Sequence, residues 1–515
     1  MSGSKPPTKQ MRYNLRSLSR TNAVVASPEP KRKRPTSNIH ELMDLNDHCL
    51  LKIFEFLDPN LVDVVRVNKR LYSLVNYYMN FKYNLQFNEN FEFATENGSP
   101  VSLDVARTFL SVFGHKMKIL KLSSGSFILP SPRTDIGLIL PMIQQFCNLQ
   151  ELTIKDFGMC GLLQSFFTQL DSLTLDNCSV SREWCKMKQL KTLKLIHFIV
   201  RRWPMEYCSR EAYYEFGLKP GPIKIPVANF GGLKELQISD TNLENPAVVQ
   251  LIELNPSLEK LSVTKNVAVS TFVFTAVQRL KNLVEFEFKK PLRKNSQSNT
   301  AYHMVSLFSL KKLKTLKLFH NIPTKQLMEG FVKNGIALEH LELGGNNFDD
   351  QSAESIVKMS SIKVLKLNDM FGLNEEQLLI IVKGLEGLEE LHVKTEANVT
   401  QAALLGIVRE AHHLHQLKID GLITPLDVET YQSMITAIQN RIERIGLRII
   451  VFGSGENSFT QNVVLDEGNE EWLSIEELDR TSNHLFEVLE SKVSLNPPVS
   501  RYYDSDSDSD SDYDD

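Results

Sequence analysis

The sequence has few of the features that take a chain into a membrane or out of the cell. No stretch approaches the roughly 18 consecutive apolar residues of a membrane-spanning helix, and the N-terminus lacks a charged segment followed by an apolar one. Cysteine is scarce: the 6 cysteines are scattered, without a Cys-x-x-Cys pair. We therefore expect reduced thiols in an intracellular protein of the cytoplasm, the nucleus or both, rather than disulfides or zinc.

The sequence also lacks the residue groupings that carry catalysis. Its 12 histidines and 62 carboxylates include no recognisable nucleophile, metal-binding or phosphate-cradling arrangement. His412, His413 and His415 lie close together, but no further cysteine or histidine stands at ligand spacing, so we interpret them as surface residues. We expect a protein that is not an enzyme and that uses no cofactor and no metal.

The net charge is small, but the charged residues are unevenly placed. The net charge is −4, yet residues 1–38 carry nine Lys/Arg against Glu29, and residues 501–515 carry seven Asp against Arg501. We expect disorder in a basic tail, 1–38, and in an acidic tail, 500–515. The run Lys31-Arg-Lys-Arg34 is typical of a nuclear import signal and equally of a chance basic cluster; without interleaved aromatics we do not expect nucleic-acid binding.

A nine-residue pattern organises most of what lies between the tails. In Leu338-Glu-His-Leu-Glu-Leu-Gly-Gly-Asn346, apolar residues fill the first, fourth and sixth positions and asparagine the ninth, as in a short strand with one buried face. Such a strand needs similar neighbours, so the pattern should recur. It starts again at Leu170, Leu190, Leu233, Leu258, Leu313, Ile362, Leu388 and Leu414, and in looser form at Met117, Leu149, Leu283 and Ile442.

The spacing of these starts predicts a solenoid. Many of the steps are 24 to 26 residues, within the roughly 20–29 residues of a leucine-rich repeat. Each period leaves room for an outer helix, and Asn374 with Gln377 is typical of a capping box. The chain resembles leucine-rich repeats of the ribonuclease-inhibitor and F-box types, which implies an α/β leucine-rich-repeat horseshoe over residues 86–450.

The ninth position and two long steps depart from the pattern. Asparagine or cysteine at 178, 266, 321 and 346 fits the family, whereas Phe157, Phe198, Pro291 and Met370 predict breaks in the polar ladder. A 43-residue step between Leu190 and Leu233 contains Trp203 and other aromatic and arginine residues within 197–228. This insertion is interpreted equally well as a binding hot spot or as a degenerate repeat. The 30-residue step after Leu283 predicts a solvated loop at 293–299.

Residues 39–85 predict three short helices. Asn46 can cap a first helix that carries Leu50, Ile53, Phe54 and Leu57, and Asp58-Pro59 stops it and starts a second. A third helix follows Asn68. So small a unit buries too little surface to be stable alone, so it needs a partner or serves as a cap on the first repeat.

These residues resemble an F-box, the module that docks the Skp-family adaptor of cullin-RING ubiquitin ligases. The resemblance lies in 45–59, 61–67 and Lys69-Arg-Leu71; the usual Leu-Pro opening is Leu45-Asn46 here, and a late tryptophan is absent. The resemblance implies that the following residues face the adaptor: Leu45, Leu50, Ile53, Phe54, Leu57, Pro59, Leu61 and Val67.

Beyond Ile442 the repeat pattern fades. Ser474-Ile-Glu-Glu477 resembles a capping box, which predicts a last helix with Leu478, Leu485 and Leu489. We therefore expect a C-terminal capping segment at 451–499 that closes the far end of the array.

Two functions remain open on the sequence. The first is the substrate-recognition subunit of an SCF-type ubiquitin ligase complex, in which the repeats bind a protein to be degraded and the reaction is promoted by proximity. The second is a leucine-rich-repeat scaffold that binds a nuclear regulatory partner without ubiquitin transfer.

The predicted substrate site is a row of fifth-position residues on the strands. Third, fifth and seventh positions point away from the core, and the fifth position supplies a mostly basic row that suits an acidic or phosphorylated segment, unless those lysines only keep the strands soluble. Our substrate-binding candidates are Lys194, Lys317, Lys366, His392, Lys418 and, from the insertion, Trp203. Ser505, Ser507, Ser509 and Ser511 alternate with aspartate, which predicts phosphorylation and a tail that competes for this row or only solvates the chain.

Overall fold

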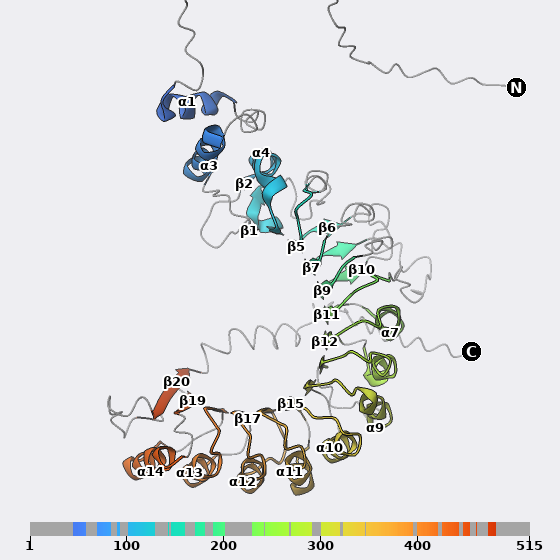
Figure 1. Ribbon diagram of the computed structural model, residues 1–515, viewed down its shortest axis with the longest axis vertical. Coiled ribbons are helices and arrows are strands. Elements are labelled where there is room, and N and C mark those ends of the chain that lie inside the picture. Colours follow the sequence, from blue (N-terminus) through green and yellow to red (C-terminus); the bar gives the residue numbers. More distant parts are fainter. Residues whose placement is uncertain are drawn as a thin grey trace, which may run out of the picture.

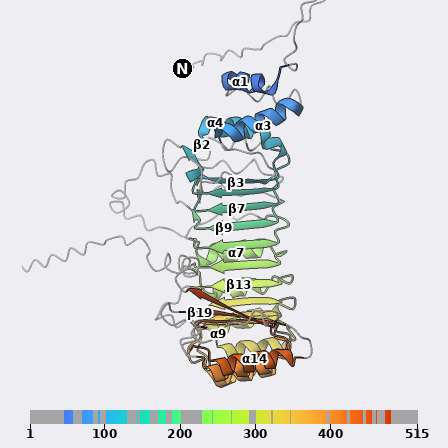
Figure 2. The same ribbon diagram turned by 90° about the vertical axis from the view of Figure 1, so that its left-hand side faces the viewer.

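The computed structural model confirms an α/β repeat solenoid built on one long parallel sheet. It describes residues 45–57, 69–83, 90–92, 101–128, 143, 146–159, 170–180, 189–200, 229–241, 243–266, 269–290, 300–319, 323–345, 347–394, 399–420, 425–441, 446–453, 460 and 472–479. Within these residues, fifteen strands pair side by side. Figure 1 shows them lining the inner side of a curved array, with helices on the outer side, and Figure 2 shows the strands stacked in parallel.

The strands follow one another along the sheet almost in chain order. They are β1 (Asn90–Glu92), β3 (Ile119–Ser123), β5 (Glu151–Lys155), β7 (Ser172–Asp176), β9 (Thr192–Ile196), β11 (Glu235–Ser239), β12 (Lys260–Thr264), β13 (Glu285–Lys289), β14 (Thr315–Phe319), β15 (His340–Gly344), β16 (Val364–Asn368), β17 (Glu390–Lys394), β18 (Gln416–Asp420), β19 (Leu447–Gly453) and β20 (Leu473–Asp479). In this sheet the strands from β3 to β18 lie within the nine-residue pattern, where strands were predicted, and begin at its third position.

The outer helices are short and pack against one another. They are α4 (Leu103–Phe113), α7 (Asn245–Leu254), α8 (Phe274–Val277), α9 (Thr300–Met304), α10 (Thr324–Lys333), α11 (Asp350–Val357), α12 (Glu375–Gly384), α13 (Gln401–Glu410) and α14 (Val428–Gln439). The predicted capping box is present at α12: the Asn374 side chain accepts from the Gln377 backbone N–H, and the Gln377 side chain accepts from the Asn374 N–H. The start of α12 is therefore fixed by local hydrogen bonds.

The core lies between the strands and these helices. First, fourth and sixth positions are buried along the array, as in Leu338, Leu341 and Leu343, and the helices contribute Leu378, Ile381 and their equivalents. Because a parallel strand with one buried face cannot stand alone, each repeat is stabilised by its two neighbours.

The ninth position behaves as predicted where it is described. The Asn266 side chain, 2% exposed, accepts hydrogen bonds from Thr241 and donates to the carbonyls of Ile238 and Thr264. Phe157, Phe198 and Met370 are buried instead. The polar ladder is thus interrupted by apolar side chains that fill the same space.

The eighth position, which the sequence reasoning missed, adopts the left-handed backbone conformation in several repeats. Its φ is positive in Asp156, Asn177, His197, Asp240, Lys265, Gly345 and Asp369. The backbone N–H of each donates to a seventh-position carbonyl of the next strand, as from His197 to Ser239 at 2.9 Å. Aspartate, asparagine and glycine tolerate this conformation best, so composition at this position carried a signal.

Two helices precede the array, α1 (Asp47–Leu57) and α3 (Lys69–Tyr83). Asn46 caps α1 as predicted, accepting from the Cys49 N–H at 2.9 Å. Tyr72 of α3 packs edge-on against Phe113 of α4, with their ring centroids 5.2 Å apart, so α3 covers the first repeat. The predicted second helix lies at 58–68, outside the described residues.

The C-terminal end differs from two predictions. Residues 473–479 form β20, which pairs in parallel with β19, so the capping box predicted at Ser474 is wrong there: backbone pairing makes this stretch extend the sheet instead. The loose repeat at Ile442 is also wrong in register, because Gln416 pairs with Arg448, which places the start at Gly446. Local spacing suited both alternatives, and pairing with the neighbouring strand selected one.

The long steps do not interrupt the main sheet. Strand β9 pairs directly with β11, residue by residue from Thr192 and Glu235, and β13 pairs with β14. A small second sheet of β6 (Gly158–Met159), β8 (Ser179–Val180) and β10 (Ile199–Val200) comes after the eighth-position bends. Trp203 and the 293–299 loop lie outside the described residues. Within the described part, no helix is long and apolar enough to cross a bilayer.

Candidate binding surface on the inner face of the sheet

The fifth-position side chains form one continuous row across the inner face. Strand pairing places them next to one another in the order Glu92, Lys121, Thr153, Thr174, Lys194, Gln237, Ser262, Glu287, Lys317, Glu342, Lys366, His392, Lys418, Ile450 and Glu476. Neighbours in such a row are about 5 Å apart at the backbone. The structure therefore brings five of the six substrate-binding candidates onto one surface.

The lysines in the first part of this row are already paired. The closest nitrogen–oxygen distances are 2.9 Å for Lys121 with Glu92, 3.0 Å for Lys194 with Glu235 and 3.0 Å for Lys317 with Glu285. Two of these carboxylates occupy third positions on an adjacent strand. The basic row predicted from the sequence is therefore neutralised over β3 to β14.

A denser charge network fills the centre of the inner face. Lys289 Nζ lies 3.1 Å from Glu287 and 3.5 Å from Glu342, and 4.4 Å from the centre of the Phe319 ring. Burial favours the neutral acid at Glu287, but the hydrogen bond from Ser262 and the charge of Lys289 outweigh it and lower its pKa. Lys289 and these two carboxylates neutralise one another, so this region offers a bound protein little unpaired charge.

The last part of the row has a different character. Within the described part of the chain, Lys366 and Lys418 form no ion pair, and they flank His392 on the two adjacent strands. Lys394 lies on the same strand as His392 and pairs with Asp369 at 3.5 Å. We call Lys366, His392 and Lys418 the C-terminal basic face.

The pKa of His392 reports the local potential. Burial is the largest cause that lowers its pKa, to about 4, and the charges of Lys366, Lys418 and Lys394 add to it, with no opposing carboxylate. At His340, two strands earlier, burial and lysine charges also lower the pKa, but Glu342 and Glu285 oppose them. The potential on the inner face thus becomes positive between β15 and β17, at a neutral imidazole that can donate a hydrogen bond.

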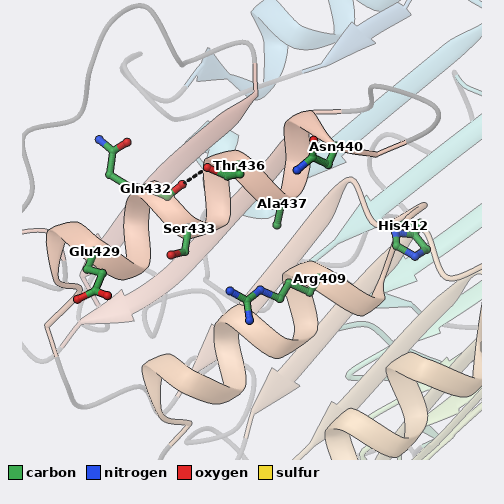
Figure 3. Close-up of a pocket in the computed structure, with 8 residues that line it drawn as sticks. All are labelled: Arg409, His412, Glu429, Gln432, Ser433, Thr436, Ala437 and Asn440. Carbon is green, nitrogen blue, oxygen red and sulfur yellow. Dashed lines mark hydrogen bonds between the residues drawn. The ribbon is translucent and has the colours of Figure 1, made fainter.

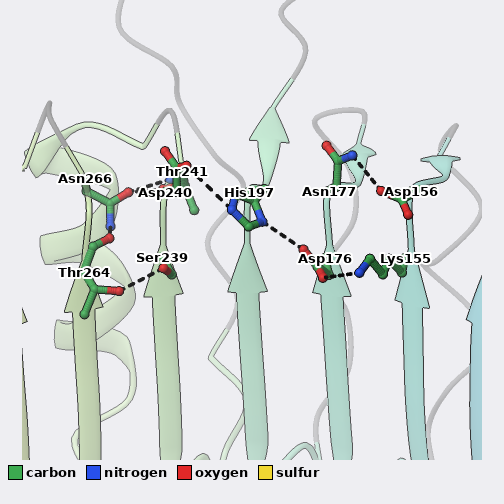
Figure 4. Close-up of polar contacts among 10 residues, drawn as sticks. All are labelled: Lys155, Asp156, Asp176, Asn177, His197, Ser239, Asp240, Thr241, Thr264 and Asn266. Carbon is green, nitrogen blue, oxygen red and sulfur yellow. Dashed lines mark hydrogen bonds and ion pairs between the residues drawn. The ribbon is translucent and has the colours of Figure 1, made fainter. Parts of the chain in front are cut away.

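A second polar cluster lies at the carboxyl-terminal edge of the strands (Figure 4). His197 Nδ1 is 3.0 Å from Asp176 Oδ1, and its Nε2 is 3.7 Å from Asp240 Oδ2. Asn177 donates to Asp156 at 2.7 Å. These side chains belong to seventh and eighth positions, so the bend in the backbone brings them together. In this part of the chain the described His, Cys, Asp and Glu residues make no group suited to a metal ion.

A groove of about 570 Å³ lies on the outer face between α13 and α14 (Figure 3). Arg409 and His412 line one wall, and Glu429, Ser433 and Asn440 line the other. The groove is open, and polar and apolar atoms line it in similar amounts, unlike the enclosed, mostly apolar sites that bind small molecules. It contains none of the predicted site residues.

The predicted adaptor-facing residues separate into two groups. Leu50 and Phe54 are 0% and 1% exposed in the core formed with α3, so their part in docking would be to hold the helices together. Leu45 and Ile53 are half-buried. The Leu57 side chain and Pro59, Leu61 and Val67 lie outside the described residues.

One exposed aromatic residue on α1 was not predicted. Phe56 is 86% exposed and comes after Cys49 and Ile53 at helical spacing, beside the buried stripe of Leu50 and Phe54. Arg70 holds the start of α1 by bonding the Asp47 carboxylate at 2.7 Å and the Leu45 carbonyl at 2.8 Å. The helix therefore presents a fixed, partly apolar face. A signal was available, since Phe56 is the one aromatic residue of this helix outside its core stripe.

No protein-family profile and no curated protein matches this sequence.

Proposed function

We propose that this protein is the substrate-recognition subunit of an SCF-type E3 ubiquitin ligase complex. Its N-terminal helices, as an F-box, would dock the Skp-family adaptor and through it the cullin-RING ligase. Its repeats, as leucine-rich repeats, would bind the protein to be ubiquitylated and sent to the proteasome. The observation that carries the proposal is a small helical module with an exposed apolar face at one end of an open inner sheet surface.

The module supports docking because its exposed face is separate from its core. Phe56 is exposed and Ile53 is half-buried, whereas Leu50 and Phe54 are buried, so a partner can cover Phe56 and the accessible part of Ile53 without opening the core. Aromatic residues that become buried at an interface commonly dominate its binding energy.

The inner face supports a protein ligand. Most of its described fifth-position side chains are polar or charged and lie on a long open surface, and the outer groove is too shallow for a small-molecule site. The reaction would be promoted by proximity, with transfer chemistry performed by other subunits. The C-terminal basic face favours an acidic or phosphorylated segment of that ligand.

The alternative function is a scaffold that binds a nuclear regulatory partner without ubiquitin transfer. One observation favours it: Tyr72 packs on Phe113, and Lys116 Nζ lies 3.6 Å above the Tyr72 ring, so α3 also serves as a cap on the first repeat. A cap of this kind needs no adaptor.

Co-purification from cells distinguishes the two functions. We expect the adaptor and the cullin to be recovered with the wild-type chain and lost with Phe56→Asp, whose side chain is too exposed to support the fold. The double variant Leu57→Asp with Leu61→Asp tests the residues taken from the family resemblance.

The matched control is Tyr302→Asp, which changes another exposed aromatic residue, 78% accessible, on the outer face of the array. This variant should retain the adaptor. If the wild-type chain recovers no adaptor, the ligase proposal is wrong and the scaffold remains.

A further inference from the structure

The C-terminal basic face is the part of the inner sheet where lysines remain without a carboxylate. Lys121, Lys194 and Lys317 each have a carboxylate partner at 2.9 to 3.0 Å. Lys366 and Lys418 have none among the described residues, and their charges meet at His392. Glu390 and Asp420 lie nearby at third and seventh positions, and neither is among the charges that act on His392. An anionic segment would therefore complement the charge of this face.

The same chain contains a segment of that chemistry. Residues 504–515 hold seven aspartates and four serines, Ser505, Ser507, Ser509 and Ser511, and no lysine or arginine. Phosphorylation of a serine would add about −1.5 to −2 charges each time. Charged phosphate oxygens accept strong hydrogen bonds from ammonium and imidazole N–H groups.

The connection between the two is long enough. The last described strand, β20, ends at Asp479, and it lies beside β19, which pairs with β18 and so with Lys418. From β20 to β17 the sheet spans three strand spacings, about 14 Å. The 24 residues between Asp479 and Asp504 can extend to at most about 80 Å. Reach therefore does not limit contact.

We propose that the C-terminal basic face binds the chain's own acidic segment, residues 504–515. Lys366 and Lys418 bind its carboxylates or phosphates from either side, and His392 donates a hydrogen bond between them. Because the segment is tethered, its effective concentration reaches the millimolar range even when its intrinsic affinity is low.

This contact makes the acidic segment a competitor of any acidic partner on the same face. Phosphorylation of its serines strengthens the competition, because each phosphate adds charge. This contact involves the array and its tail alone, and it is independent of whether the protein is a ligase subunit or a scaffold.

Zero-length crosslinking of the full-length chain tests the proposal. A carbodiimide joins a carboxylate to an amine only when the two are in contact, and mass spectrometry identifies the joined residues. We expect crosslinks from Lys366 and Lys418 to residues 504–515, stronger after treatment with an acidophilic kinase. Their yield should fall severalfold between about 0.05 M and 0.5 M salt, because added salt shortens the screening length.

Full-length variants complete the test. The Lys366→Gln, Lys418→Gln double variant should bind an acidic peptide no more tightly than the wild type does. Replacing the seven tail aspartates by asparagine should instead leave the C-terminal basic face accessible to the peptide. The asparagine variant should bind a labelled phosphorylated 502–515 peptide at least threefold more tightly than the wild type. The control, Lys121→Gln with Lys194→Gln, should bind that peptide as the wild type does.

Two outcomes would overturn the proposal. One is that the tail crosslinks mainly to Lys31 and Lys33, which would make the basic N-terminal residues its partner. The other is that the wild type and the asparagine variant bind the peptide equally. Recovery of the adaptor in cells is unaffected by either outcome, so failure here is distinguishable from failure of the proposed function.

Discussion

Replacing Lys366 and Lys418 by glutamine should raise the pKa of His392. This pKa is lowered to about 4. Burial is the largest cause, and the charges of Lys366, Lys418 and Lys394 add to it. A unit charge about 7 Å away, at an effective dielectric of about 40 to 80, shifts a pKa by roughly half a unit to one unit. Removing two such charges should therefore bring the pKa of His392 to roughly 5 to 6.

The same group makes stability depend on pH. The pKa of His392 is about 4 in the folded chain and about 6.5 when unfolded, so the unfolded chain binds more protons between these values. Stability is complete above about pH 6.5 and is lost as the pH falls toward 4. At pH 5 the wild-type chain should lose about 2 kcal/mol through this residue relative to pH 7. The His392→Asn variant should not show this loss.

Histidine titration by NMR measures the pKa directly, and urea unfolding at pH 7 and pH 5 measures the free energy. Comparison of wild type with His392→Asn cancels the contributions of other titrating groups. Lys121→Gln with Lys194→Gln is the control and should leave the pKa of His392 unchanged. If the pKa is about 4 in both glutamine variants, burial alone sets it, and the positive potential inferred for this face is wrong.

Three further changes test the repeat architecture by urea unfolding and amide hydrogen exchange. Asn266→Ala leaves buried backbone groups without partners, so we expect a loss of about 2–4 kcal/mol and faster exchange at Thr241, which gives its N–H to Asn266. Gly372→Ala should cost about 2 kcal/mol, because its φ is +87° and a Cβ would lie 2.8 Å from the Phe348 carbonyl oxygen. Asn374→Ala should cost about 1 kcal/mol through loss of the cap of α12, and unchanged stability would mean that packing alone holds this helix start.

The sequence was sufficient for the repeat array because its signal is local and repeated. Leu338, Leu341 and Leu343 specify one buried face, and the strand that carries them requires a neighbour with the same pattern. The helix start at Asn374 was equally local, since its hydrogen bonds lie within four residues.

The sequence-based predictions were wrong where pairing between residues far apart in the chain determines the structure. Ser474 and Glu477 suit a helix start, yet pairing with β19 makes them part of a strand. The charge of the inner row also depends on pairing, since Glu235 and Glu285 neutralise Lys194 and Lys317 from neighbouring strands. Spacing within one repeat does not say which carboxylate stands beside which lysine. Only the structure shows that, among the described lysines of this row, Lys366 and Lys418 have no carboxylate partner.

The left-handed residue at the eighth position also determines how much the length of the chain between two strands can vary. Once His197 has donated its N–H to Ser239, the register of the next strand is complete. The chain between the eighth residue and the next strand does not affect that register. Strands whose first residues are as few as 20 or as many as 43 residues apart are neighbours in the same sheet. A foreign peptide grafted just after an eighth residue should therefore extend the loop without shifting a single strand. In this array, the length of an inserted segment and the spacing of the strands are therefore independent.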